Sequence, residues 1–446
     1  MKSNHNLIQE SGKHNNEINN YSLKGIYWTQ TKFDVAKYNE IKENLNLDSH
    51  VAELAAARGI KSSDFYQYIN PKIKNLLPDP FVLDDMEKAT KKIVNYIKEE
   101  KKIGILGDYD VDGASATALL CNYFREINVD FEFYIPDRIN EGYGPNINAL
   151  MNLKKKGCEL ILTLDCGTSS VNCINETNKE NIDIIIVDHH LQSKVLPEAF
   201  AIINPKKEKD TSNLNNLCAT GVVFLLTVSI NRELKKDDYF KLKLPNLIKY
   251  LDLVALATIC DLVKLDNINR AFVKQGIKIL NKLNNTGIAA LVECASVNQL
   301  LNEYHLGFVL GPRINAGGRV GDSRLGVSLL TSRDKTMSLI LSSKLCSFND
   351  TRRSIETKVL FEAENQVNEN SEEIICVHGE GWHPGVLGIV AAKITEKYGR
   401  PSIVISEDSE NCSASCRSVK SFDIGAFIIN SVNDGILISG GGHKMA

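Results

Sequence analysis

The stretch GDYDVDG, residues 107–113, decides the fold of this chain, because an apolar strand pattern stops there and a helical pattern begins. The preceding residues, IGIL at 103–106, are apolar and partly β-branched, as in a strand that is buried on both faces. The following residues, ASATALLCNYF at 114–124, are typical of a helix. Between them, three carboxylates stand at alternating positions, and alternate side chains of an extended segment point the same way. The sequence therefore predicts a strand over 102–107, a helix over 114–127 and three acids at their junction.

Three more apolar runs end in acidic or imidazole side chains. They read LILTLDCGT (160–168), IDIIIVDHH (182–190) and LVALATICDLV (253–263), and we interpret them as strand-like. In an open parallel sheet, the carboxyl ends of the strands line the ligand crevice. The layout therefore directs eight side chains to one place, namely Asp108, Asp110, Asp112, Asp165, Asp188, His189, His190 and Asp261.

Several ionised carboxylates cannot share a cleft without cations, because their mutual repulsion is too costly. A set of Asp and His ligands suits Mn²⁺ or Mg²⁺ better than a thiolate-rich zinc site would. Other readings stay open for the single motifs. GDYDVDG could be a calcium loop, although residue 119 is Leu where an EF-hand has Glu. Asp165 could cap a helix, the two histidines could lie in a solvated loop, and Asp252 competes weakly with Asp261.

Composition indicates an ordinary globular protein. The chain has 446 residues, 43% of them hydrophobic and 24% charged, and a net charge of −3, so any nucleic-acid-binding surface must be local. No apolar stretch approaches 18 residues, and the polar N-terminus lacks the apolar core of a signal peptide, so we expect no membrane segment. Eleven scattered cysteines without CxxC pairs indicate a reducing cytoplasm.

The order of patterns predicts two α/β domains. Strand and helix patterns alternate from 101 to about 265, which implies a parallel sheet; helical patterns alone fill 265–365, and a second α/β pattern starts at 373. We expect a polar, disordered tail over 1–46, a parallel-sheet domain with an N-terminal helical segment over 47–265, a long helical connector over 266–370, and a smaller α/β domain over 371–446. Asp84 or Asp85 is the expected N-cap of a helix near 86–100.

The distribution of arginine is a second clue. The chain has 39 lysines and 13 arginines, yet residues 283–334 contain no lysine and include Arg313, Arg319, Arg324 and Arg333. Where a lysine-rich chain uses arginine, bidentate phosphate recognition is one interpretation and a structural ion pair is the other.

The last segment carries glycine-rich turns that suit an anion. GWHPG (381–385), SASCRS (413–418) and GGGH (440–443) expose backbone N–H groups, and Ser415, Arg417 and His443 could grip a phosphate there. His383, in the first of these turns, is a further nucleic-acid-binding candidate. Each of these signals alone also fits an ordinary turn.

The order DYDVDG, DCG, DHH, CDLV resembles the DHH phosphoesterase superfamily, and the details are most similar to its exonucleases specific for single-stranded DNA. Further matching stretches, among them GFVLGPRINAGGR and GWHPGVLGIVAAKITEKYGRPSIVIS, extend the resemblance over about residues 50–446. The family has a DHH phosphoesterase domain followed by a DHH-associated substrate-binding domain.

The resemblance implies a hydrolase with two metal ions. Its metal ligands would be Asp110, Asp112, Asp165, His189 and Asp261. His190 would meet the scissile phosphate, with Asp108 and Asp188 as further catalytic acids. Arg313 or Arg319, together with Ser415 and Arg417, would face the DNA backbone and its 5′ end.

Two departures accompany this resemblance. Leu106 stands where many members have a histidine. The chain ends at GGGHKMA, so we expect an incomplete C-terminal domain without the OB-fold that holds single strands.

The function that we expect is Mn²⁺- or Mg²⁺-dependent 5′→3′ hydrolysis of single-stranded DNA to mononucleotides, in DNA repair and recombination. A single-strand-binding protein and a helicase are possible partners. Two alternatives stay open: a DHH phosphodiesterase acting on short oligonucleotides or cyclic dinucleotides, and a non-catalytic single-strand-binding or replication scaffold protein. The intact acidic set argues against the last, because a binding module has no need of so many mutually repelling carboxylates.

Overall fold

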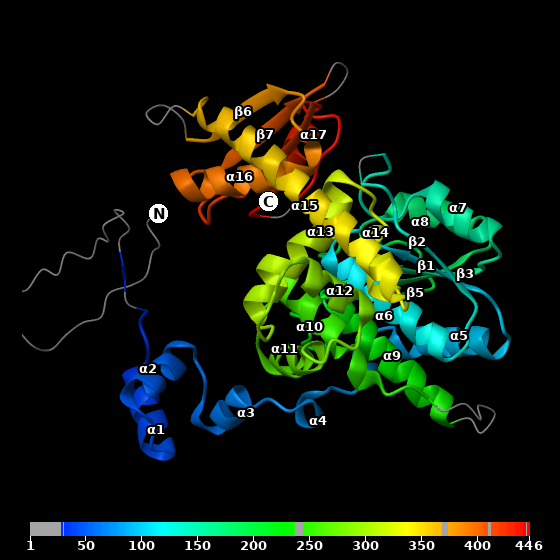
Figure 1. Ribbon diagram of the computed structural model, residues 1–446, viewed down its shortest axis with the longest axis horizontal. Coiled ribbons are helices and arrows are strands. Elements are labelled where there is room, and N and C mark those ends of the chain that lie inside the picture. The colour runs from blue at the N-terminus through cyan, green and yellow to red at the C-terminus, as the bar shows by residue number, and fades with distance from the viewer. Residues whose placement is uncertain are drawn as a thin grey trace, which may run out of the picture. The chain divides into compact units, whose positions relative to one another are not determined.

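The computed structural model describes residues 28–29, 31–138, 140–236, 244–367, 373–408, 412–442 and 444–446 (Figure 1). It divides into two compact units, Pro71–Arg352 on the one hand and Met1–Asn70 with Arg353–Ala446 on the other. Each of its helices is too short or too polar to cross a bilayer, within the residues described.

A five-stranded sheet of parallel strands forms the centre of the unit Pro71–Arg352. Its order is β2 (Phe131–Tyr134), β1 (Ile103–Gly107), β3 (Leu160–Leu164), β4 (Asp183–Val187) and β5 (Ala201–Ile203). Strands β1, β3 and β4 follow the three buried-strand patterns of the sequence. The predicted α/β fold with a parallel sheet is therefore confirmed.

Alternate residues of the central strands enter two separate hydrophobic cores, one on each face of the sheet. Ile103 and Ile105 belong to one core, whereas Leu106 belongs to the other. The first core contains residues of α5 (Met86–Lys98), α6 (Val111–Glu126) and α9 (Ala219–Lys236), and the second contains residues of α7 (Ile147–Lys155) and α8 (Val171–Asn178) (Figure 1). Burial on both faces explains why these strands read as continuous apolar runs.

Further helices extend the first core beyond the sheet. They are α4 (Ile73–Leu76), η2 (Pro80–Val82), η3 (Leu247–Tyr250), α10 (Leu251–Cys260), α11 (Asn267–Leu280), α12 (Thr286–Cys294), η4 (His305–Leu310), α13 (Gly311–Val320), α14 (Leu325–Thr331) and the long α15 (Lys335–Glu364). Residues such as Phe272, Leu291 and Leu329 are buried in the same core as the sheet. The segment 266–352 is thus part of this unit, which differs from the predicted connector; the 30-residue helix α15 continues into the other unit.

The unit made of Met1–Asn70 and Arg353–Ala446 holds a smaller α/β domain and a group of N-terminal helices. The domain has a three-stranded sheet in the order β6 (Ile375–Glu380), β7 (Ser402–Glu407) and β8 (Cys412–Arg417), with β8 antiparallel, and the helices α16 (Pro384–Tyr398) and α17 (Ile424–Asn433). The N-terminal helices are α1 (Val35–Leu45), α2 (Ser49–Ala57), η1 (Ser62–Asp64) and α3 (Phe65–Ile69). The predicted second, smaller α/β domain is confirmed.

Two local predictions are wrong. The run 253–263 is not a strand, because α10 covers Leu251–Cys260. The tail 1–46 contains the helix α1, which the Asp34 side chain caps by accepting the amide of Ala36 at 2.9 Å; residues 1–27 lie outside the described residues. The predicted N-cap is confirmed, because Asp85 holds that position of α5, although its side chain makes no cap hydrogen bond there and instead accepts the amide of Ile202 at 2.9 Å.

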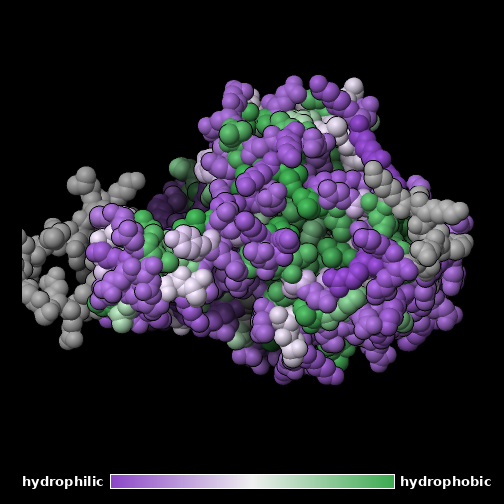
Figure 2. Space-filling view, turned by 90° about the horizontal axis from the view of Figure 1, so that it is seen from below, coloured by the Kyte–Doolittle hydropathy of each residue, from purple (hydrophilic) through white to green (hydrophobic). Residues whose placement is uncertain are grey.

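The surface is not uniformly polar. Hydrophobic side chains reach it in several places among hydrophilic ones on the face shown in Figure 2. The most exposed large ones in the unit Pro71–Arg352 include Leu262, Leu300 and Phe308.

Helices α10 and α11 lie so close together that Gly276 cannot be replaced without a shift. A Cβ atom at this position would lie 2.1 Å from the Leu251 carbonyl oxygen. We expect Gly276→Ala to lower the free energy of unfolding by about 1–3 kcal/mol, as overpacked cores do. Urea unfolding tests this, with Lys278→Ala on the exposed side of α11 as the control, which should change stability by less than about 0.5 kcal/mol. Equal effects of the two substitutions would contradict the close packing.

Candidate metal centre

Three acids leave the sheet side by side. Gly107, Leu164 and Val187 are register partners at the ends of β1, β3 and β4, so Asp108, Asp165 and Asp188 are the next residues on three neighbouring strands. All three carboxylates are buried. The parallel register, set by the cores on the two faces, therefore places these acids at one level.

The turn after β1 brings two more acids to the same edge. Asp110 is the N-cap of α6, and its side chain accepts the amide of Gly113 at 3.0 Å. A Cβ atom at Gly113 would lie 2.5 Å from the Cβ atom of Asp108, so only glycine allows the first turn of α6 to approach the strand end this closely. The DYDVDG spacing thus fixes Asp108, Asp110 and Asp112 around one tight junction.

Asp112 is held by the beginning of another helix, α9. Its carboxylate accepts the amides of Ala219 at 2.6 Å and Thr220 at 2.8 Å, and the Thr220 hydroxyl at 2.6 Å. Free N–H groups at a helix N-terminus favour an anion. The hydrogen bonds from α9 therefore satisfy the Asp112 carboxylate although its side chain is almost fully buried.

Asp165 is the most constrained acid of the site. Its backbone adopts the left-handed conformation, with φ 62°, and its carbonyl oxygen accepts the hydroxyl of Tyr143 at 2.9 Å. Its Oδ1 atom is buried and has no hydrogen-bond partner. A buried carboxylate oxygen without a partner is costly, so the site lacks a positive group at this point.

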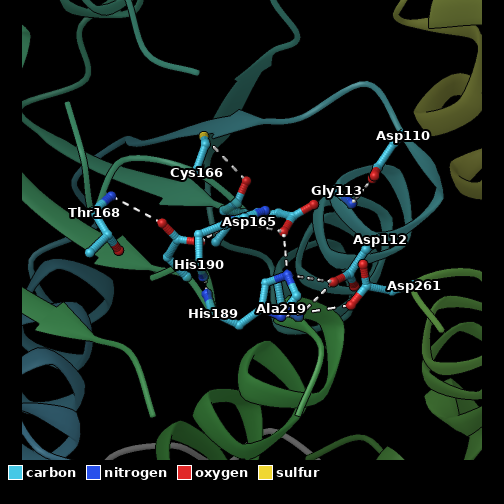
Figure 3. Close-up of polar contacts among 12 residues, drawn as sticks. Asp110, Asp112, Gly113, Asp165, Cys166, Thr168, His189, His190, Ala219 and Asp261 are labelled. Carbon is cyan, nitrogen blue, oxygen red and sulfur yellow. Dashed lines mark hydrogen bonds and ion pairs between the residues drawn. The ribbon is translucent and has the colours of Figure 1, made fainter. Parts of the chain in front are cut away.

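His189 faces three of the acids. Its Nε2 atom lies 3.3 Å from Asp165 Oδ1 and 3.7 Å from Asp112 Oδ2, and its Nδ1 atom lies 3.7 Å from Asp261 Oδ2 (Figure 3). Nδ1 is buried without a hydrogen-bond partner. Burial lowers the pKa of His189 despite the nearby Asp112, which leaves the neutral imidazole that metal ions bind.

His190 is oriented by Asp188. The Nδ1 atom of His190 lies 2.8 Å from Asp188 Oδ1, and Asp188 also accepts the backbone amides of Thr168, His189 and His190. Burial alone would raise the pKa of Asp188, but the His190 and Thr168 hydrogen bonds lower it overall. Burial alone would lower the pKa of His190, but the hydrogen bond to Asp188 raises it overall. The ring therefore donates from Nδ1 and keeps Nε2 for another partner.

Asp261 completes the group from the end of α10, where it is the C-cap residue. Burial, followed by Asp112 and Asp110, raises the pKa of Asp261 to about 8. Asp252, in the first turn of the same helix, accepts the amide of Leu253 at 2.7 Å and belongs to none of the metal-binding groups found among the described residues. The geometry therefore favours Asp261 over Asp252.

Three overlapping groups of side chains are arranged to hold cations. They are Asp165 with His189 and His190, Asp112 with His189 and Asp261, and Asp108 with Asp110 and Asp165, each with its ligand atoms within 4.8 Å of one another. Asp165 Oδ1 and His189 Nδ1 are two of the seven buried side-chain atoms without a hydrogen-bond partner among the described residues, and both residues belong to these groups. The donor set of carboxylates and imidazole fits Mn²⁺ or Mg²⁺, so the residues present suit the predicted cofactor.

Of the two predicted arginines in the PRINAGGR stretch, Arg319 is the one on which Asp110 acts electrostatically. Burial lowers the pKa of Arg319 to about 10, with contributions from Arg138 and Arg352, while Asp110 and Tyr109 oppose the shift. Arg313 instead donates to the carbonyl oxygen of Val309, in the preceding η4, at 2.8 Å. Guanidinium groups that gather beside Asp110 suit an anion, such as a phosphate on metal ions.

The candidates in the C-terminal domain lie around the first turns of α16. His383 is the N-cap of α16 and accepts the amide of Gly385 at 3.0 Å. A Cβ atom at Gly388 would lie 3.2 Å from an Nη2 atom of Arg417 and 3.6 Å from the Ser415 hydroxyl, so β8 presents both side chains to this helix. His443 lies outside the described residues.

Sequence reasoning missed several groups that shape the site. They are Arg138, Tyr143, Thr168, Ala219, Thr220 and Asn315, of which Asn315 accepts the amide of Val111 at 3.0 Å. Tyr143 in EGYG and Asn315 in PRINAGG lie in glycine-containing stretches that could have marked them. Nothing in the local pattern at 219–220 indicates a helix start that would hold Asp112.

Comparison with known proteins assigns these motifs to two domain families. The DHH family N-terminal domain matches residues 102–258, and the DHHA1 domain matches residues 371–446. The single-stranded-DNA-specific exonuclease RecJ of Haemophilus influenzae is 32% identical over 426 residues, which cover 92% of this chain and 73% of that protein. The chain belongs to the RecJ family.

Other members of the RecJ family agree. RecJ of Bacillus subtilis is 33% identical over 94% of this chain, which spans only 52% of its length. The crystal structure of RecJ from Thermus thermophilus in complex with Mn²⁺ superposes with a TM-score of 0.78 at 26% identity, over 92% of this chain and 58% of that one. A structure of exonuclease RecJ bound to manganese gives a TM-score of 0.70 at 28% identity, over 81% of this chain and 89% of that one.

The raised carboxyl pKa values make the stability of the metal-free protein depend on pH. Burial is the main cause of the raised pKa values of Asp108, Asp165 and Asp261. The folded protein therefore keeps protons on these carboxyl groups that the unfolded chain releases above about pH 4. The free energy of unfolding should therefore fall as pH rises from about 4 to about 8.

Urea unfolding in a chelator at pH values of about 5, 6, 7 and 8 measures this dependence. Asp261→Asn should reduce the fall, because an amide does not titrate. A stability that rises over this range in the metal-free protein would show that the acids are compensated without cations.

Proposed function

We propose that the chain is a metal-dependent exonuclease that hydrolyses single-stranded DNA from the 5′ end to mononucleotides. The observation that carries the proposal is the group of metal-binding side chains that share Asp165 and His189, both with buried atoms that lack a partner. The similarity to RecJ proteins supports the substrate. Mn²⁺ or Mg²⁺ is the proposed cofactor, as two ions.

In this proposal Asp110, Asp112, Asp165, His189 and Asp261 hold the ions. Bound there, divalent cations would neutralise the charge of the phosphodiester and polarise its oxygens. Asp108 adds negative charge to the group that contains Asp110 and Asp165.

The remaining side chains act on the substrate. Asp188 fixes the His190 ring so that Nε2 faces the scissile phosphate and can hold a proton for it. Arg319 supplies positive charge beside Asp110, and its planar group suits phosphate oxygens. Ser415, Arg417, His383 and His443 are proposed to bind the strand from the C-terminal domain.

Hydrolysis of short oligonucleotides or cyclic dinucleotides is the alternative reaction. It needs the same metal ligands, so only substrate preference separates the two. The arginines that converge near Asp110 favour a polyanionic strand. All eleven cysteines are free, which supports the cytoplasm as the compartment. A single-strand-binding protein and a helicase stay predicted partners.

Asp165→Ala should lower the rate of hydrolysis of a 5′-labelled single strand by at least about 100-fold, because even the partners behind metal ligands are worth 10–100-fold. The matched control is Asp252→Asn, a buried acid of the same unit outside the metal-binding groups, which should keep activity. Rates with Mn²⁺ present measure both. Wild-type-like activity of Asp165→Ala would overturn the two-metal proposal.

Arg319→Ala should weaken strand binding and lower the slope of log affinity against log salt by roughly 0.7, the value of one phosphate contact on a single strand. Fluorescence anisotropy in an Asp165→Ala background, which leaves the strand intact, measures the slope. Arg324, which pairs with Asp322 at 3.0 Å on the exposed surface, is the control, and Arg324→Ala should leave the slope unchanged. A slope unaffected by Arg319→Ala would assign that residue a structural role.

A further inference from the structure

Two aromatic rings that are exposed to solvent stack on each other shortly before the PRINAGGR stretch (312–319). Tyr304 is 62% exposed and Phe308 is 70% exposed. Their ring centroids lie 5.2 Å apart and their planes are inclined by only 24°. The other side of η4 is buried through His305, Leu306 and Leu310, so the helix itself is anchored while the pair faces outward.

The core does not account for this pair. Aromatic side chains usually contribute to stability by burying their large apolar surface, and these two leave most of it in water. Packing on the other side of η4 already holds the helix in place. The exposed faces of the pair are therefore available to a ligand.

The anchored side of η4 rests on the helix end that supplies Asp261. The Cys260 thiol donates to the carbonyl oxygen of Leu306 at 3.4 Å, and a Cβ atom at Gly307 would lie 3.3 Å from the Ile259 side chain. Leu262, directly after Asp261, is 89% exposed. The helix that carries the aromatic pair thus packs against the segment that supplies Asp261.

The following helix, α13, contacts the turn that carries Asp108, Asp110 and Asp112. On α13, the Asn315 side chain accepts the amide of Val111, and a Cβ atom at Gly318 would lie 2.9 Å from the Tyr109 ring. The segment from Tyr304 to Val320 therefore contacts both the end of α10, which supplies Asp261, and the turn that carries Asp110.

We propose that Tyr304 and Phe308 form a stacking platform for bases of the single strand whose end lies at the metal centre, with Leu262 as an apolar neighbour. This inference rests on the proposed function. Every base has a π-face, so stacking on aromatic rings tolerates any sequence, as a nuclease that moves along a strand requires.

A protein partner fits the patch less well. A stable interface takes about 800 Å² and about 20–30 residues from each side. The exposed apolar side chains here are few, namely Leu262, Leu300, Tyr304 and Phe308. A row of bases needs no larger surface than this.

The test compares a normal oligonucleotide with one that carries abasic sites, bound to the full chain in the Asp165→Ala background. Phe308→Ala should weaken binding of the normal strand by between about 5-fold and about 150-fold, the effect of one stacked base. It should leave binding of the strand with abasic sites unchanged. Tyr304→Phe keeps the ring and should bind both strands like the parent protein.

Phe361, an exposed phenylalanine of α15 at 67%, is the matched control, and Phe361→Ala should leave binding of both strands unchanged. Equal losses for Phe308→Ala and Phe361→Ala, or equal losses on both strands, would overturn the platform. Unchanged DNA binding with altered self-association of Phe308→Ala would also overturn it, in favour of a protein contact. Hydrolysis by the unmodified protein is measured separately, because its absence would instead reject the proposed function.

Discussion

Repulsion among buried carboxylates is the constraint on which the rest of this structure depends. Asp108, Asp110, Asp112, Asp165 and Asp261 share one largely buried region. Part of the cost is offset locally, because the first turn of α9 donates to Asp112 and the first turn of α6 donates to Asp110. The part that remains falls on Asp165, whose Oδ1 atom has no hydrogen-bond partner and whose pKa burial raises well above its usual range, and this buried oxygen marks the centre as a place for cations.

The sequence predicted both the sheet and most of the candidate site because both depend on strands that are buried on both faces. Strands buried on both faces are continuous apolar runs, so a polar residue at the end of such a run is conspicuous, as Asp108, Asp165 and Asp188 are. Parallel strands place these ends together. The positions of His189 and His190 followed from their adjacency to the third run, and the structure separates their surroundings: His189 faces acids, whereas His190 is held by Asp188.

The wrong predictions concern segments whose hydrophobic pattern does not define their place in the fold. Helix α10 is buried on all sides from Leu251 to Thr258, so an apolar run there looks like a buried strand. Residues 266–352 were predicted to connect two domains because helical periodicity shows that a helix has an apolar face but not which core that face enters. Contacts between distant segments, such as Thr220 with Asp112 or Asn315 with Val111, leave no local signal at all.

The strands β1, β3 and β4 end at the same level of the sheet, and this has a consequence for how the chain folds. The acids that meet at its edge are separated by dozens of residues and by whole crossover helices, so no short peptide from this sequence can reproduce the group. Pairing of such distant strands is slow to form, because loops must close before the contacts repay them. Cations that need the assembled group bind only the native chain and shift the folding equilibrium by mass action. The concentration of divalent cations would then set the stability of the fold as well as the occupancy of the site.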